Sequence, residues 1–107
     1  MLTDQIDFVR TASVRALTSL AQIKEGKVQI YDLDKLNTII MLLYDIEEQT
    51  RLNTIQLISM VAEYPPAREK FKQALEKLNE MARQTTDKPL IATHAQVAID
   101  VITWVPW

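Results

Sequence analysis

Apolar residues recur along most of the chain at intervals of three and four, the spacing that places them on one face of an α-helix. No stretch of useful length alternates with the two-residue period of a β-strand, and a proline pair, a further proline and acid-rich turns separate the helical stretches. We therefore expect an all-α protein with a single domain over residues 1–107. The expected helices cover about residues 7–22, 27–31, 34–44, 50–63, 67–73, 74–84 and 89–104.

The first long helix is expected to bury one stripe and to show another to solvent or to a partner. The buried stripe consists of Val9, Ser13, Ala16, Leu17 and Leu20. The other face consists of Thr11, Arg15, Thr18 and Gln22. The third helix is apolar on nearly every side, Met41 and Leu42 included, so neighbours are expected on both of its flanks.

Residues suited to helix ends lie between the helical stretches. Asp4 or Asp7 can cap the first helix, because a carboxylate accepts hydrogen bonds from the unpaired N–H groups of a first turn. Asp34 and Asp87 are expected to cap the third and the last helix in the same way. Gly26, the only glycine, is expected to end the first helix by adopting the left-handed backbone that a helix ending favours.

The pattern of the first helix returns after 51 − 10 = 41 positions, where Arg51 corresponds to Arg10 and Ile58 to Leu17. A second shift of the same length places Ile58 on Ile99. A helical repeat near forty residues is typical of HEAT and armadillo arrays, whose units bury their apolar faces only against neighbouring units. The sequence therefore predicts a right-handed armadillo/HEAT-like α-solenoid of about two and a half repeats.

Composition narrows the classes of function. Hydrophobic residues make up 48% of the 107 residues and charged residues 24%, which is ordinary for a folded protein. Twelve basic and fourteen acidic side chains give a charge of 12 − 14 = −2, and no basic stripe follows a face, so nucleic acid is not an expected partner. No apolar run approaches the roughly twenty residues that span a bilayer, and no secretory signal opens the chain. We expect a soluble cytoplasmic protein without membrane contact.

Catalysis and metal binding have little support. The absence of cysteine removes thiol nucleophiles and thiolate zinc sites. His94 is the only histidine and lies beside an apolar stripe, so a structural or surface role is favoured over a metal site. Asp45, Glu47 and Glu48 lie in a polar connection, where carboxylates are usually solvated or cap a helix. One glycine cannot form a phosphate-binding loop. We expect no enzyme activity, no cofactor, no metal and no small-molecule substrate.

A group of basic residues lies in the second half of the chain. It consists of Arg68, Lys70, Lys72 and Lys77, interleaved with Glu69, Glu76 and Glu80. This interleaving favours a salt-bridged surface over a phosphate-binding patch.

Both ends of the array are candidates for contact with other proteins. Trp104 and Trp107 could either seal the end of the solenoid or anchor in a pocket of another protein. Sealing is favoured, because the last unit of a solenoid must cover its apolar end. At the other end, the apolar side of the first helix lacks a preceding unit, and an exposed face of that kind predicts a partner.

The segments SVRALTSLAQ, GKVQIYDLDKLNTIIMLL and TRLNTIQLISMVAE resemble armadillo units. More narrowly, the chain resembles the C-terminal part of the radial spoke head protein 14 family, armadillo-repeat components of the ciliary axoneme. VRTASVRALTSLAQIKEGKVQI, TRLNTIQLISMVAEYPPAREKF and KPLIATHAQVAIDVITW carry this likeness over nearly all of the chain. It implies a non-catalytic scaffold subunit in the cytoskeleton of the motile cilium or flagellum, with other radial spoke proteins as partners. Because the resembling proteins have further N-terminal repeats, a short relative and a fragment of a longer array both fit.

Many nuclear-import-type armadillo proteins carry a ladder of tryptophan and asparagine on their long third helices. The corresponding positions here are Arg15, Ser19, Gln56, Met60, Val97 and Val101, so the ladder is missing. Binding of extended basic peptides in that mode is not expected. An alternative to a scaffold is a transient armadillo/HEAT adaptor that binds a helical or extended peptide outside any fixed complex. The candidate partner-binding residues are Arg15, Thr18, Gln22, Gln56, Met60, Trp104 and Trp107.

Overall fold

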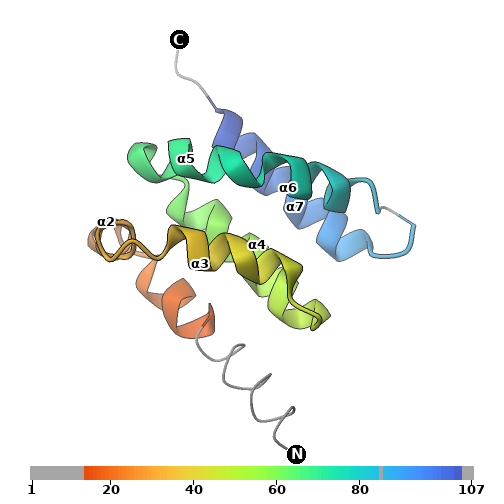
Figure 1. The fold of residues 1–107 in the computed structure, drawn as a ribbon, viewed down its shortest axis with the longest axis horizontal. Helices are drawn as coiled ribbons and strands as arrows, with labels where there is room; N and C mark the ends of the chain where they lie inside the picture. Colours follow the sequence, from red (N-terminus) through yellow and green to blue (C-terminus); the bar gives the residue numbers. More distant parts are fainter. Residues whose placement is uncertain (1–13, 85, 105–107) are drawn as a thin grey trace, which may run out of the picture.

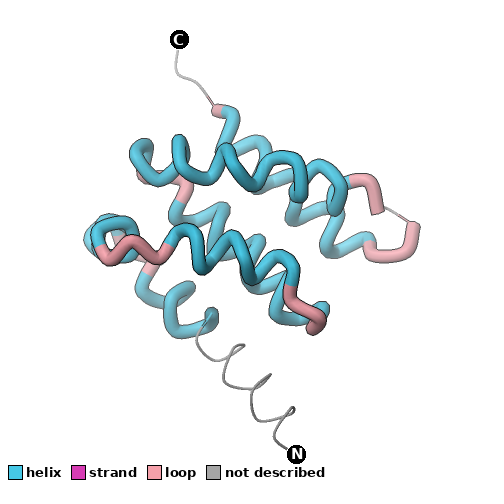
Figure 2. The backbone as a smooth tube through the Cα atoms, in the orientation of Figure 1, coloured by secondary structure: helices cyan, strands magenta, loops and turns pink. Residues whose placement is uncertain are grey.

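The computed structural model describes residues 14–84 and 86–104, which form helices and short turns without a β-strand (Figures 1 and 2). The prediction of an all-α fold is confirmed. The first described helix covers residues 14–20, and Asp4, Asp7 and the expected helix start lie outside the described residues. The helices that follow are α2 (Lys24–Asp32), α3 (Leu36–Met41), η1 (Leu42–Tyr44), α4 (Glu48–Val61), α5 (Pro65–Phe71), η2 (Lys72–Ala74), α6 (Leu75–Ala82) and α7 (Pro89–Thr103).

The helices form two layers. In Figure 1, α3, α5 and α6 lie in front of α4 and α7, and the two long helices run side by side in the same direction. α7 packs against both α4 and α6, which ties the layers together. The smallest dimension of the molecule is 20 Å, which is the thickness of two helices of about 10 Å each.

The same three-helix unit occurs twice in the described part of the chain. The shift found in the sequence relates Lys24 to Pro65, the starts of α2 and α5, and relates Glu48 to Pro89, the starts of α4 and α7. The middle helices are α3 and α6. A shift of 41 positions from the start of α3 falls just after the start of α6. The difference arises because η2 joins α5 directly to α6, whereas a turn separates α2 from α3. The period read from the sequence is therefore also the period of the helices.

The last long helix buries the face that its sequence pattern predicts. Five apolar residues recur in it at helical spacing, and all of them are buried, namely Ile91, Ala95, Ala98, Ile99 and Ile102. Four polar residues of the same helix are all exposed, namely Thr93, Gln96, Asp100 and Thr103. The third helix is buried on part of its surface. Leu36 and Ile39 are 1% exposed, and α3 contacts both α4 and α5, as expected of a helix with neighbours on two flanks. Met41 is 66% exposed, so the side of the helix that carries Met41 has no neighbour among the described residues.

The first described helix buries less of its expected stripe. Leu17 and Leu20 are half-buried and pack against the core, whereas Ala16 is exposed, so the expectation that Ala16 is buried is wrong. Val9 and Ser13 lie outside the described residues. Within this helix, full burial falls instead on Val14.

Gly26 does not end a helix. It lies inside α2, and the left-handed residue is Asp34, which follows α2 with a φ of 56°. The first helix ends at residue 20, and the chain then turns through Ile23, whose backbone is extended. The first helix end and α2 approach so closely that a Cβ atom at position 26 would lie 1.7 Å from the carbonyl oxygen of Leu20. The prediction of a left-handed glycine is wrong, because a contact between two helices requires the glycine.

The two expected aspartate caps are also absent from their helices. Lys35 and Lys88 occupy the N-cap positions of α3 and α7, and neither helix has a side-chain cap hydrogen bond. Asp34 instead closes the end of α2, and its carboxylate lies 3.7 Å from the Lys70 Nζ atom. The backbone N–H of Lys88 donates to the carbonyl of Gln84, so the chain before α7 follows a turn of its own.

Candidate protein-interaction surface

Lys27 and Arg68 lie one repeat apart, and each holds the end of the preceding helix. The Lys27 Nζ atom is 2.6 Å from the carbonyl oxygen of Ala21, and the Arg68 Nε atom is 2.9 Å from that of Ala62. Ala21 and Ala62 are themselves one repeat apart. The last carbonyls of a helix lack backbone hydrogen-bond donors and carry partial negative charge. A cationic side chain at this end donates the missing hydrogen bond and offsets the charge. The repeat therefore includes polar contacts as well as apolar positions.

A second pair of positions follows the same repeat. Lys27 Nζ lies 3.8 Å from the carboxylate of Glu63, and the guanidinium carbon of Arg68 lies 5.3 Å from the ring centroid of Trp104. The shift that relates the two cations also relates Glu63 to Trp104. An ion pair in one unit is thus replaced by a cation–π contact in the next. Trp104 is 57% exposed, so more than half of its surface is open to solvent or to a partner.

The candidate partner-binding residues are accessible to different degrees. Arg15 and Gln22 are exposed, whereas Gln56 and Met60 are half-buried. Thr18 is half-buried, and its hydroxyl donates to the carbonyl of its own helix at Val14. Trp107 lies outside the described residues.

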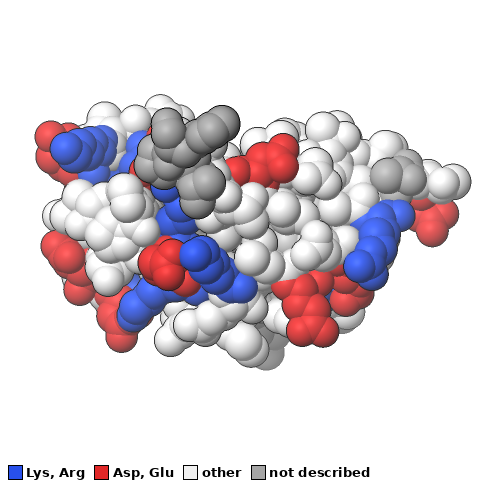
Figure 3. Space-filling view, turned by 90° about the horizontal axis from the view of Figure 1, so that it is seen from above, with Lys and Arg blue, Asp and Glu red and all other residues white. Residues whose placement is uncertain are grey.

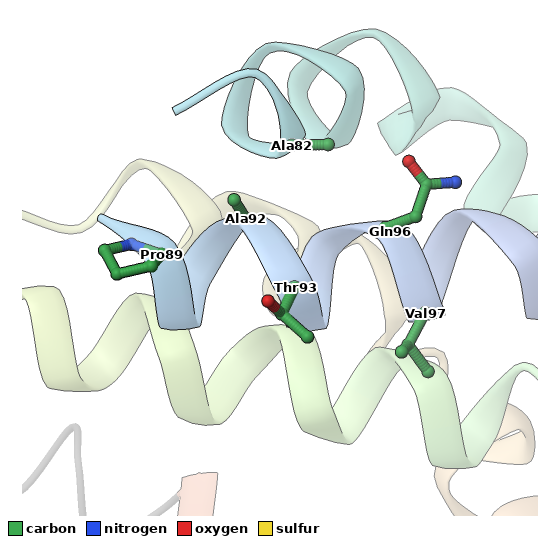
Figure 4. Close-up of a pocket in the computed structure, with 6 residues that line it drawn as sticks. All are labelled: Ala82, Pro89, Ala92, Thr93, Gln96 and Val97. Carbon is green, nitrogen blue, oxygen red and sulfur yellow. The ribbon is translucent and has the colours of Figure 1, made fainter. Parts of the chain in front are cut away.

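We use the name long-helix face for Arg15, Ser19, Gln56, Met60, Val97 and Val101, which occupy two equivalent positions in each long helix. α4 and α7 pack side by side, so Gln56 and Val97 lie on adjacent helices at the same position of the repeat. Every residue of the face is exposed or half-buried, and Val97 is 46% exposed. Figure 4 shows that the Val97 side chain points away from α6. The face offers aliphatic side chains near α7 and a cation on the first helix.

A cavity of about 460 Å³ lies between α6 and α7 (Figure 4). Its described lining consists of Ala82, Pro89, Ala92, Thr93, Gln96 and Val97. None of these side chains is an acid or a base, so the described lining offers no group for proton transfer.

A second cavity, of about 390 Å³, lies between α5 and the end of α7. Its described lining consists of Pro65, Arg68, Glu69, Lys72, Ile102, Thr103 and Trp104. Sequence reasoning did not find this site, because it grouped Arg68 with the solvated cations of the surface. The correspondence between Lys27 and Arg68 across the repeat is the signal that could have separated Arg68 from them.

Two other cations of the basic group form pairs of the kind expected from the interleaving of acids and bases. Lys72 Nζ lies 2.6 Å from the Glu69 carboxylate, and Lys77 Nζ lies 3.4 Å from that of Glu80. Figure 3 shows acidic and basic side chains close together on the face seen from above. Exposed pairs of this kind contribute about 0 to 1 kcal/mol each to stability. Because each cation has an acid beside it, this surface carries charges of both signs.

The carboxylates of the connection before α4 take part in local contacts. The Asp45 carboxylate accepts a hydrogen bond of 2.9 Å from the backbone N–H of Glu47, and the Glu48 carboxylate lies 3.5 Å from Lys88 Nζ. Arg51 donates to the backbone carbonyls of Asp45 and Ile46. These contacts shape the turn into α4 and join the starts of α4 and α7.

Residues 14–84 and 86–104 contain no group of three or more histidine, aspartate or glutamate side chains arranged to hold a metal ion. His94 is half-buried on α7. Within the same ranges, no helix is long and apolar enough to cross a membrane.

The fold and the surface define an all-α protein built from a repeated three-helix unit. Comparison with known protein families finds no family model that matches the chain, and comparison with curated proteins finds no significant match. Function is therefore inferred from the repeat, the exposed surface and the features of the sequence.

Proposed function

We propose that this chain is a non-catalytic scaffold subunit, a short right-handed armadillo/HEAT-like solenoid that joins other proteins in a large assembly. The observation that carries the proposal is the three-helix unit that recurs with the period of the sequence and with the same polar contacts at its helix ends. Units of this kind cannot bury their apolar faces alone, so they stack and leave an extended surface for other proteins.

Two rows of equivalent positions support a stacked arrangement. Positions 14 and 55 are fully buried valine and isoleucine, whereas position 96 is an exposed glutamine. Position 16 is an exposed alanine, whereas positions 57 and 98 are fully buried leucine and alanine. Residues two apart in a helix point about 200° apart, so the two rows face opposite sides of each long helix. The row of positions 14, 55 and 96 is exposed at the last helix, and the row of positions 16, 57 and 98 is exposed at the first described helix. Exposure of opposite sides at the two ends is expected of a one-dimensional stack.

The assembly that we propose is the radial spoke of the motile cilium or flagellum, with other radial spoke proteins as the partners and the axoneme as the location. This part of the proposal is supported by the resemblance of the sequence segments to the radial spoke head armadillo family. The packing of the helices supports only the proposal of a solenoid and has no bearing on which assembly the chain joins.

The long-helix face is the proposed contact with those partners. It combines accessible aliphatic residues, Met60 and Val97 among them, with the polar side chains of Arg15 and Gln56. An apolar centre with polar or cationic neighbours is the usual composition of a protein interface. Exchanging Arg15 and Gln56 for alanine removes polar contacts without opening a cavity in the core.

The test is incorporation of the tagged chain into axonemes of ciliated cells. The double variant Arg15→Ala, Gln56→Ala should keep its helical circular dichroism and lose most of its incorporation. A matched control exchanges Asn37 and Glu76, which are exposed on the other layer, and should incorporate normally. Undiminished incorporation of the first variant would refute the assignment of this face.

Salt extraction separates a scaffold from a transient adaptor. A structural subunit is expected to stay with isolated axonemes in moderate salt, because apolar contacts are not screened. Release of the chain together with weakly bound proteins would favour an adaptor that binds a helical or extended peptide outside any fixed complex.

A further inference from the structure

The cavity between α5 and the end of α7 combines apolar rings with hydrogen-bond donors that have no partner among the residues the structure describes. Trp104 is 57% exposed and Pro65 is exposed, and both line the cavity, whose volume is about 390 Å³. This volume falls within the range of about 300 to 1,000 Å³ that is usual for ligand-binding pockets. The site can therefore hold several side chains of a partner.

Arg68 is held in place by the protein itself. Its Nε atom donates to the Ala62 carbonyl at 2.9 Å, and its Nη2 atom lies 3.3 Å from the Glu63 carbonyl oxygen. Within residues 14–84 and 86–104, its Nη1 group has no hydrogen-bond acceptor. Because the Arg68 side chain is already ordered in the free protein, it loses little further conformational entropy when it binds a ligand.

The other polar groups of the cavity are largely occupied. Lys72 pairs with Glu69 at 2.6 Å, and the Thr103 hydroxyl donates to the Ile99 carbonyl at 2.7 Å. The indole N–H of Trp104 donates to no residue in the described ranges. The donors left for a ligand are therefore on Arg68 and Trp104, beside two apolar rings.

We propose that this cavity binds a proline-rich segment of a partner protein in the polyproline II conformation. Proline residues present apolar rings and carbonyl acceptors but no backbone N–H, which complements a surface of rings and unpaired donors. A polyproline segment is already extended before it binds, and aromatic-lined grooves recognise it for this reason. The proposal rests on the proposed scaffold function, because it assigns Trp104 the chemistry of a partner contact.

The test measures fluorescence anisotropy of a fluorescein-labelled peptide of ten prolines, titrated with the full 107-residue chain. Saturable binding is expected, with no binding of an alternating glycine–serine peptide of the same length. Trp104→Ala should weaken binding on the order of thirtyfold, the effect of truncating a residue that dominates an interface. Trp104→Phe keeps a ring but lacks the N–H group, so a smaller loss is expected.

Arg68→Lys is the second diagnostic variant. Lys27 satisfies the equivalent helix end, so the fold should tolerate lysine at position 68, and circular dichroism should confirm a native helix content. Binding of the proline peptide should weaken about tenfold, because lysine cannot bind the helix end and present a second donor group at once. Leu90→Ala, on an exposed side chain that does not line this cavity, should leave binding unchanged.

Three results would overturn the proposal. They are no saturable binding of the proline peptide, binding that Trp104→Ala leaves unchanged, and tighter binding of a glycine–serine peptide that carries one phenylalanine. The last result would assign the cavity to an aromatic side chain. Loss of peptide binding leaves the incorporation test of the Arg15 and Gln56 variant intact, so the two proposals fail separately.

Discussion

Replacing Gly26 by alanine sets two physical effects against each other. Gly26 lies inside α2 without a positive φ, and in an exposed helix interior alanine is favoured over glycine by about 1 kcal/mol. The added Cβ atom would lie 1.7 Å from the Leu20 carbonyl oxygen and 2.6 Å from the Leu20 carbonyl carbon. Both are backbone atoms, which cannot rotate away as the end of a side chain can.

The clash should outweigh the gain in helix propensity. Ordinary contact begins near 3.4 Å, so the first helix end and α2 must separate by about 3.4 − 1.7 = 1.7 Å. Overpacking of a core costs about 1 to 3 kcal/mol, and a backbone overlap belongs at the upper end of that range. Subtracting the gain of about 1 kcal/mol leaves a loss of about 2 kcal/mol or more in the free energy of unfolding.

Urea denaturation followed by circular dichroism measures this loss. With a denaturant dependence of about 1 to 3 kcal/mol per molar urea, the midpoint should fall by roughly 1 M. Gln29→Ala, at an exposed site of the same helix, is the matched control and should change the free energy of unfolding by less than about 0.5 kcal/mol.

Gly26→Asn separates close packing from a left-handed backbone. Asparagine adopts the left-handed region more readily than alanine, so a left-handed site would tolerate asparagine better. Close packing predicts that asparagine destabilises at least as much as alanine. A Gly26→Ala protein as stable as the native chain, or an asparagine variant more stable than the alanine variant, would refute this reasoning.

Two other substitutions test the repeat. Lys27→Met removes the cation at the end of the first helix and leaves the Ala21 carbonyl unsatisfied, so it should cost about 1 to 3 kcal/mol in chemical denaturation. Lys70→Met, which removes an exposed pair with Asp34 and a cation–π contact with Tyr31 but leaves no buried carbonyl unsatisfied, should cost less than about 1 kcal/mol. Ile55→Ala should cost about 2 to 5 kcal/mol because the side chain is fully buried, whereas Gln96→Ala, one repeat later, should change thermal stability by less than about 0.5 kcal/mol. Equal losses at positions 55 and 96 would contradict the burial rows.

The pattern of apolar residues was sufficient to predict the helices and the face that α7 buries. Helical periodicity is a local property, because the spacing of side chains around a helix depends only on the backbone of that helix. The repeat could be read from the sequence for a similar reason, since equivalent helices need equivalent apolar positions. Pro65 and Pro89 fix the starts of α5 and α7, because proline is tolerated in the first turn and not later.

The candidate site was predicted only in part. Exposure of Arg15 and Trp104 agrees with a role in partner contact, but nothing in the sequence indicated that Trp104 would lie beside Arg68 or border a cavity. Arg68 lies among other cations in the sequence, and its distinct role depends on its distance from the end of α4. Distances between elements are set by the packing of the whole chain.

Sequence by itself therefore determined that the chain is helical, how its helices repeat and which face of the last helix is buried. Tertiary structure alone decided that Gly26 serves a close contact, that Asp34 takes the left-handed backbone and that Met41 stays exposed. The physical reason is that helix formation depends on neighbours along the chain, whereas close approach and burial depend on residues that folding brings together from distant positions.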